Sequence, residues 1–189
     1  MKDNYSILID PGHGGYRNGA FAKQPGTDSL VYEKDINFIL GCLIETLSYK
    51  TPKIIADLTR NDDSDISLND RVFTSKTYDI MISVHCNSYE FDTPSGFEIH
   101  HNRSEESTEL ANCILKALNN NIVSMINRGL KQSDDLYILN KSHCPAVIVE
   151  CGFMSNAKDL QFLINPKNQI KIAKTILAGA KNYLLMGEL

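Results

Sequence analysis

The sequence lacks several features that would define other classes of protein. None of its 189 residues fall in a stretch approaching the ~20 consecutive apolar residues that a transmembrane helix needs. Near the N-terminus, only residues 7–9 form an apolar run before a Pro-Gly turn, which is far too short for a signal peptide. The sequence therefore predicts synthesis in the cytoplasm without a leader, and no insertion into a membrane.

Charge and cysteine content exclude further classes. The 19 Lys and Arg residues against 23 Asp and Glu leave a formal net charge of −4. This balance lacks the basic footprint of nucleic-acid-binding proteins, so no nucleic-acid partner is expected. The five cysteines are odd in number and include no C-x-x-C pair, which argues against a disulfide framework and against a structural zinc knuckle. Reduced thiols are expected.

What the sequence does contain is an alternation of short apolar runs and helical periods. Residues 80–84 and 146–149 are near-continuous apolar runs, which are typical of strands buried on both faces. Strands that alternate with helices indicate an α/β layer architecture, and no Pro/Gly/Ser-rich linker divides it. The predicted strands are residues 5–10, 53–58, 78–86, 96–101 and 145–151, with a short extended piece at 136–139. The predicted helices are residues 31–49, 66–77, 105–118 and 166–185, and residues 14–29 are a predicted polar loop.

Three predicted strands end at a residue that can bind a metal or transfer a proton. His13 follows the first strand, His85 ends the third, and Glu150 ends the last. Ligands bind beyond the carboxyl ends of strands in open α/β sheets, so parallel strands would bring these side chains to one rim, within reach of Glu33. Two histidines and a carboxylate form a catalytic zinc set with a fourth position for water, whose pKa zinc lowers to about 7. One further carboxylate is then needed for proton transfer, and these four residues supply that number.

The same residues lie in motifs that resemble, in order and spacing, the zinc-dependent N-acetylmuramoyl-L-alanine amidases. The likeness covers practically the whole chain. The motifs are DPGHGG (residues 10–15), EKDIN (33–37), LTR (58–60) followed by Leu68 and Arg71, SVHCN (83–87), SGFE (95–98), NRG (127–129), DLYIL (135–139) and PAVIVECGFMSN (145–156).

The resemblance implies that His13, Glu33 and His85 hold one zinc ion per chain and that Glu150 is the catalytic carboxylate. It implies a mixed, mainly parallel sheet of about six strands with helices on both faces. The implied substrate is bacterial peptidoglycan, cut between the lactyl group of N-acetylmuramic acid and the L-alanine of the stem peptide. Strand alternation returns Asn87 to the side of His85, which makes it a candidate for binding substrate.

One part of the chain departs from the family pattern. Members often carry an acidic residue shortly after the Gly-Gly pair, where this chain has Tyr-Arg-Asn at residues 16–18. Loops of this kind shape substrate subsites, so the preference for one type of wall does not follow from the resemblance.

Three alternatives remain beside this interpretation. A cysteine hydrolase would use Cys86 or Cys151, although strand alternation turns both thiols away from the rim. The others are a zinc peptidase of related fold and a non-catalytic wall-binding module. Surface or structural roles are expected for the remaining histidines, because His100 and His101 point to opposite faces of one strand and His143 lies in a loop.

The resemblance also bears on the setting, since family members include sporulation, cell-separation and phage lysis enzymes. Without a signal peptide, release through a holin or from a mother cell is expected, with action on the cell wall. We expect a monomer and a single catalytic domain over residues 1–189. The end of the chain directly after the last helix is consistent with a domain excised from a longer protein that bears a C-terminal wall-binding module.

Overall fold

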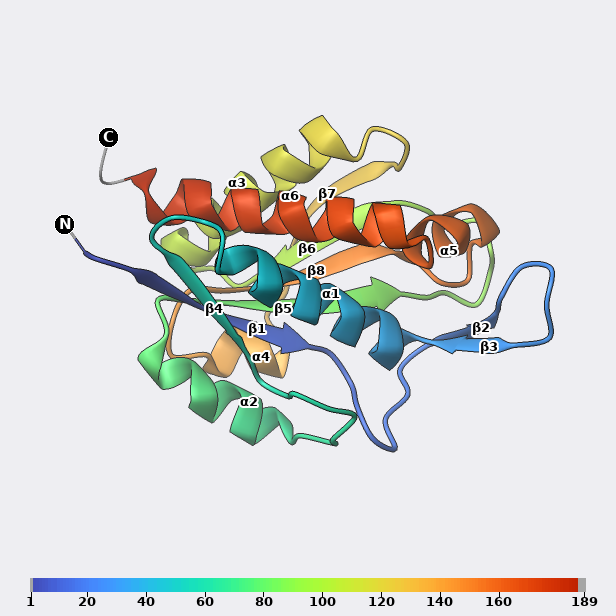
Figure 1. The fold of residues 1–189 in the computed structure, drawn as a ribbon, viewed down its shortest axis with the longest axis horizontal. Coiled ribbons are helices and arrows are strands. Elements are labelled where there is room, and N and C mark those ends of the chain that lie inside the picture. Colours follow the sequence, from blue (N-terminus) through green and yellow to red (C-terminus); the bar gives the residue numbers. More distant parts are fainter. Residues whose placement is uncertain (1, 187–189) are drawn as a thin grey trace.

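The computed structural model describes residues 2–186, which are built around one central β-sheet (Figure 1). The elements in chain order are β1 (Tyr5–Pro11), β2 (Phe21–Lys23), β3 (Leu30–Tyr32), α1 (Glu33–Ser48), β4 (Ile54–Leu58), α2 (Leu68–Thr74), a 3₁₀ turn (Ser75–Thr77), β5 (Ile80–Asn87), β6 (Phe97–His101), α3 (Glu105–Asn121), β7 (Asn127–Gln132), α4 (Tyr137–Lys141), β8 (Ala146–Phe153), α5 (Ala157–Leu163) and α6 (Pro166–Leu184).

The central sheet has six strands in the order β4-β1-β5-β8-β6-β7. The four strands β4, β1, β5 and β8 run parallel, whereas β6 is antiparallel to β8 and β7 is parallel to β6. The carboxyl ends of β1, β5 and β8 therefore meet at one edge of the sheet. The predicted fold class, a mixed and mainly parallel α/β sheet with helices on both faces, is confirmed. No helix within the described residues is long and apolar enough to cross a membrane.

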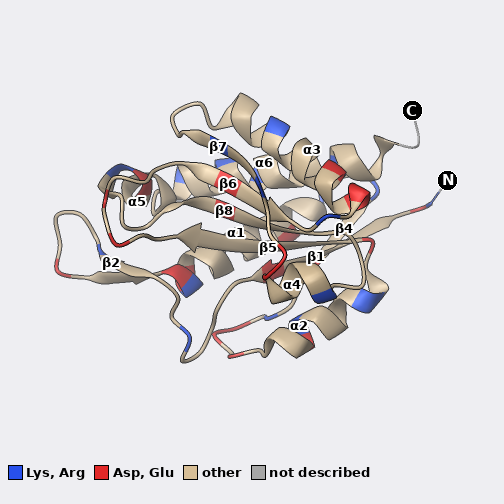
Figure 2. Cartoon of the chain, turned by 180° about the vertical axis from the view of Figure 1, so that it is seen from behind, with Lys and Arg blue, Asp and Glu red and all other residues tan. Residues whose placement is uncertain are grey.

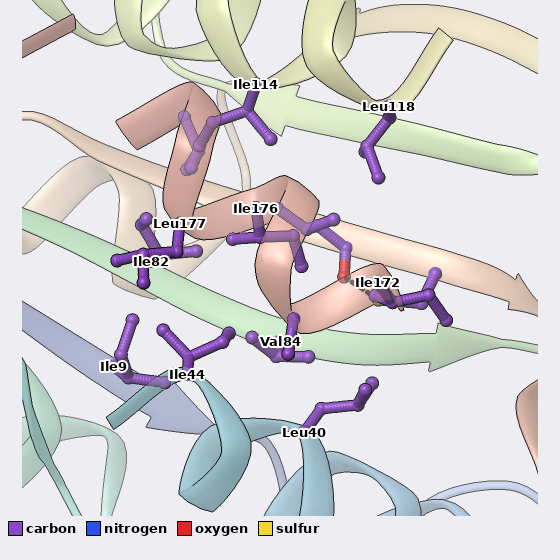
Figure 3. Packing of buried hydrophobic residues seen from close by; sticks show 14 of the residues in the cluster. Ile9, Leu40, Ile44, Ile82, Val84, Ile114, Leu118, Ile172, Ile176 and Leu177 are labelled. Carbon is purple, nitrogen blue, oxygen red and sulfur yellow. Dashed lines mark hydrogen bonds between the residues drawn. The ribbon is translucent and has the colours of Figure 1, made fainter. Parts of the chain in front are cut away.

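Each face of the sheet packs against its own set of helices. The larger core lies between the sheet and α1, α3 and α6, and Figure 3 shows part of it, with Leu40 and Ile44 of α1 facing Ile9 and Val84 of the sheet. The smaller core lies on the opposite face, beneath α2 and α4. Side chains alternate between these faces along every strand, so neighbouring residues of β5 and β8 enter different cores.

Helix α1 begins at the residue that reaches the edge of the sheet. Glu33 is its first residue, where a negative charge is favoured by the helix dipole. Ile36, Leu40 and Ile44 follow at intervals of three and four residues and are buried against the sheet. Glu33 lies on the same helical stripe, so burying that apolar face also directs its carboxylate inward.

The structure differs from the sequence prediction in four segments. The predicted loop 14–29 contains β2, which pairs with β3 in a short antiparallel hairpin. The predicted extended piece at 136–139 is instead the start of α4, and its apolar residues pack on the smaller core. β7 and α5 were not predicted. β7 is an edge strand with no fully buried residue, and α5 has only seven residues, so neither presents a long apolar period.

Candidate active site

The loop after β1 is held in an uncommon conformation. His13 has a φ of 64°, in the left-handed region that residues other than glycine rarely adopt. Its carbonyl oxygen accepts a hydrogen bond of 2.7 Å from Nη2 of Arg71, and Nη1 of the same guanidinium donates to Pro11 O at 2.9 Å. Arg71 also contacts the buried carboxylate of Asp10, with 2.6 Å between Nη1 and Oδ1. These bonds from a buried arginine fix the backbone that presents the His13 ring.

Two glycines allow side chains of the site to approach the backbone closely. A Cβ on Gly12 would lie 2.2 Å from Cε1 of His85, and a Cβ on Gly19 would lie 2.3 Å from Oε2 of Glu33. Gly19 also has a φ of 67°. Any larger residue at either position would displace a side chain of the site.

Three side chains from distant parts of the sequence meet at the carboxyl edge of β1 and β5. The Glu33 carboxylate lies between two imidazoles, with 3.1 Å from its Oε2 to His13 Nε2 and 3.0 Å from its Oε1 to His85 Nδ1. One ligand atom from each of the three residues lies within 4.8 Å of the others. Backbone N–H groups of Ala20 and Cys86 donate to the same carboxylate at 2.8 and 3.2 Å, which orients it.

Burial and hydrogen bonding have opposite effects on the pKa values of these groups. Burial alone would raise the pKa of the Glu33 carboxyl, but its hydrogen bonds with His13 and His85 outweigh this and hold the pKa well below its ordinary value. Burial would lower the pKa of His85, but the hydrogen bond with Glu33 raises it above its ordinary value. A divalent cation bound by these groups would displace the protons of the imidazoles, so its affinity falls at acid pH.

Glu150 lies beside this cluster on the next strand of the sheet. It is opposite His85 in the β5–β8 ladder, and it faces Glu98 across the β8–β6 ladder. Within residues 2–186, its buried Oε2 has no hydrogen-bond partner. Burial raises the pKa of Glu150 to about 7, against the opposing effect of His85 and with a further rise from the nearby carboxylates of Glu33 and Glu98. A buried carboxyl with this pKa can both accept and release a proton near neutral pH.

Asn87, His100 and His101 were also singled out in the sequence, and the structure places them on β5 and β6. Asn87 lies on the same side as Glu98, and its Nδ2 donates to Glu98 Oε1 at 3.0 Å, while its Oδ1 accepts from Ser88 N. Of the remaining histidines, His100 contacts the same Glu98 oxygen at 3.2 Å. His101 is buried and bonded to the carbonyl of Asn102, on the other side of the strand.

His143 and the cysteines Cys86 and Cys151, which were also singled out in the sequence, lie away from the site. His143 is exposed in the loop before β8. Cys86 and Cys151 are buried in the larger core, on the face opposite His85, and burial raises the pKa of both thiols. A nucleophilic cysteine needs an accessible thiolate, so this arrangement disfavours the cysteine-hydrolase alternative.

Sequence reasoning missed Glu98, which shares the rim with Glu150. Its carboxylate is buried and is bonded to Asn87, His100 and Arg128. A signal was available, because Glu98 lies between two apolar residues in a short strand, where a carboxylate is costly to bury without a partner.

The donor set fits a zinc ion. Two imidazole nitrogens and one carboxylate are the three protein ligands of many catalytic zinc sites, and the fourth position of such sites is left open. Glu150, whose Oε2 has no hydrogen-bond partner among the described residues, lies directly beside this set, as hydrolysis requires of a group that transfers protons. The fold and the site together define a hydrolase-type α/β domain with a candidate metal centre at the edge of its sheet.

Comparison with known proteins identifies the family. The model of the N-acetylmuramoyl-L-alanine amidase family matches residues 7–182, and the chain belongs to this family. The amidase LytC of Bacillus subtilis is 29% identical over 94% of this chain, which spans only 35% of LytC.

Solved structures agree with this assignment. An N-acetylmuramoyl-L-alanine amidase from Clostridium difficile 630 superposes with a TM-score of 0.88 at 30% identity, covering 97% of this chain and 98% of that one. The CwlD amidase from Clostridioides difficile, in complex with the GerS lipoprotein, superposes with a TM-score of 0.85 at 30% identity, covering 97% and 100% of the two chains. The predicted class of enzyme is confirmed by these relatives.

Proposed function

We propose that this protein is a zinc-dependent amidase that hydrolyses the bond between N-acetylmuramic acid and the L-alanine of the peptidoglycan stem peptide. One observation carries the proposal: His13, Glu33 and His85 converge beside Glu150, a carboxyl whose buried Oε2 has no hydrogen-bond partner within residues 2–186. Membership of the amidase family supports the choice of substrate.

His13, Glu33 and His85 would hold one zinc ion per chain. When bound, zinc supplies Lewis acidity that polarises the amide carbonyl and makes a water molecule nucleophilic near neutral pH. Glu33 is kept ionised by its two histidine neighbours, so it is ready to bind a cation. The bonds from Arg71 to the backbone of residues 11–13 hold His13 in place.

Glu150 transfers the protons of the reaction. Its pKa of about 7 lets the carboxylate take a proton from the attacking water and then deliver it to the departing alanine nitrogen. Burial is the main cause of this pKa, and Glu33 and Glu98 add to it. Asn87 is a further candidate for contacting substrate, in a position fixed by its bond to Glu98.

A Glu150→Gln variant tests this assignment against metal binding. We expect wall hydrolysis to fall by ~100-fold or more, the scale of general acid–base catalysis, while bound zinc stays near one per chain. His85→Ala should instead lose zinc and activity together. Loss of zinc in Glu150→Gln would move Glu150 into the ligand set and contradict the proposal.

Analysis of the reaction products separates the amidase from its alternatives. Mass spectrometry of digested peptidoglycan should find free L-alanine amino termini and intact glycan. Cleavage inside the stem peptide would indicate a zinc peptidase, and binding without cleavage would indicate a wall-binding module. Removal of metal by EDTA should abolish activity.

The setting of the enzyme is part of the same proposal. We propose a monomer and a single catalytic domain over residues 1–189. We propose that it acts on the cell wall, which it reaches by release through a holin or from a mother cell. Light scattering of the purified protein would test the monomer, since a dimeric mass would contradict it.

A further inference from the structure

A row of ionisable side chains continues from the candidate active site across strands that the metal set does not use. His85 lies opposite Glu150, and Glu150 lies opposite Glu98. Arg128 of β7 comes next, with 2.8 Å between its Nε and Glu98 Oε2. Figure 2 views the sheet from the side of α2 and α4 and shows acidic positions on β6 and β8 next to each other. The row ends on the edge strand β7, where the sheet meets solvent.

The Arg128 side chain is held in a defined orientation. Its Nε is bonded to Glu98, and its guanidinium carbon lies 4.8 Å from the centre of the buried Phe153 ring. Glu98 is in turn bonded to Asn87 and His100, so the carboxylate that anchors the arginine is itself fixed. A guanidinium that is already oriented loses less conformational entropy when it binds a ligand.

The outer end of Arg128 is available to a ligand. Its side chain is 34% exposed, and neither Nη atom has a hydrogen-bond partner in the part of the chain that the structure describes. A guanidinium with two open N–H groups binds a carboxylate bidentately. We propose that Arg128 binds a carboxylate of the stem peptide. This inference rests on the proposed amidase function.

The order of the row places this carboxylate on the departing peptide. Glu150 delivers a proton to the alanine nitrogen, so the peptide leaves on the Glu150 side of the metal set, and Arg128 lies further in that direction. Glu98, which anchors the guanidinium, lies two strand spacings of ~4.8 Å from His85, and the Arg128 backbone lies three, so the guanidinium is about 10–14 Å away. An extended peptide spans ~3.5 Å per residue. Arg128 therefore reaches a carboxylate about three to four residues from the cut bond, a range that includes the C-terminus of a tetrapeptide.

A pair of synthetic substrates tests the proposal. Both are N-acetylmuramoyl tetrapeptides in which the free carboxyl group of the second residue is amidated and the third residue is lysine. The two substrates differ only at the C-terminus, which is a free carboxylate in one (the acid) and an amide in the other (the amide). The zinc-loaded wild-type protein should have a KM for the acid about tenfold lower than for the amide, the scale of a hydrogen bond to a charged group. Arg128→Gln should lose this preference, and Arg128→Lys should keep part of it, because lysine retains charge but not the fork.

Arg103→Gln is the matched control. Arg103 forms an ion pair with Asp134 at the opposite end of β6, so this variant removes the same charge and should keep the preference. Thermal unfolding and zinc content of every variant show whether it is folded. A structural role through Glu98 would change hydrolysis of the acid and the amide equally, and this result would overturn the proposal.

Binding of the two free tetrapeptides, without sugar, separates this proposal from the amidase assignment. Calorimetry on the zinc-loaded protein should show tighter binding of the acid, and Arg128→Gln should abolish the difference. If nothing is hydrolysed but this difference appears, the amidase function fails and the carboxylate site stands. If the substrates are hydrolysed but acid and amide bind equally in the wild type, the carboxylate site fails and the amidase stands.

Discussion

Replacing Arg71 with methionine removes the buried guanidinium that holds the loop carrying His13. The arginine is 3% exposed and donates to the carboxylate of Asp10 and to the carbonyls of Pro11, His13 and Ile66. Methionine has a similar length but replaces none of these donors. The variant therefore leaves a buried charge and three carbonyl groups each short of a donor.

The magnitude follows from the charge left behind. Asp10 is 1% exposed and keeps only hydroxyl donors, from Thr59 and Ser83. Removing one partner of a buried ion pair costs about 3–5 kcal/mol, a large part of the ~5–15 kcal/mol by which a folded domain is stable. We expect the free energy of unfolding of Arg71→Met, measured by urea titration, to fall by about 3–5 kcal/mol. Zinc affinity should fall by roughly 10- to 100-fold, because His13 loses the support of its backbone.

Two further variants isolate the cause. Asp10→Asn combined with Arg71→Met should lose less stability than the sum of the single variants, by about 1 kcal/mol or more, because the unpaired carboxylate is gone. Arg17→Met is the control, since Arg17 is largely exposed and lies 3.3 Å from Asp65, and its loss should cost no more than about 1 kcal/mol. The reasoning is refuted if Arg71→Met is no less stable than Arg17→Met, or if the double variant is strictly additive.

Three other predictions concern the site and its surroundings. Gly12→Ala should weaken zinc binding in a chelator competition, because its Cβ would lie 2.2 Å from the His85 ring; unchanged affinity would mean that the ring can move freely. Burial raises the pKa of Glu98, but Arg128 and His100 outweigh this effect and hold the pKa below its ordinary 4.5. The stabilisation that the ionised Glu98 provides is therefore present above pH 4.5 and is lost as the pH falls through the lowered pKa. Urea titrations from pH 6 down to about 3 should accordingly show a smaller loss of stability in Glu98→Gln than in the wild type, and parallel curves would contradict this. Iodoacetamide should leave activity intact, because Cys86 and Cys151 are buried, and inactivation prevented by replacing either one would revive the cysteine-hydrolase alternative.

The sheet could be predicted where apolar runs were long, and it could not where burial was one-sided. β5 and β8 are covered on both faces by the two cores, so their sequences read as continuous apolar runs. β7 lies at the edge and buries little, and β2 and β3 form a hairpin outside the central sheet. Such strands are defined by their partners in space, which local periodicity does not reveal. α4 was misread as extended because a one-turn helix and a short strand both show adjacent apolar residues.

The candidate site divides in the same way. His13 follows β1, and His85 and Glu150 lie in the carboxyl-terminal halves of β5 and β8, so their arrival at one edge could be inferred from parallel order alone. The role of Glu98 could not, because it depends on β6 running antiparallel, which sets Glu98 directly opposite Glu150. The bonds of Arg71 to the loop of residues 10–13 likewise join segments about sixty residues apart.

The sequence by itself determined the layered α/β architecture and indicated the candidate metal-binding and acid–base groups, because both depend on residue type and on short-range periodicity. The tertiary structure decided how those groups are charged and held. Burial beside other carboxylates raises the pKa of Glu150, and two imidazoles keep Glu33 ionised. Both effects depend on distances between residues far apart in the chain and on the exclusion of water, and only the folded molecule sets these.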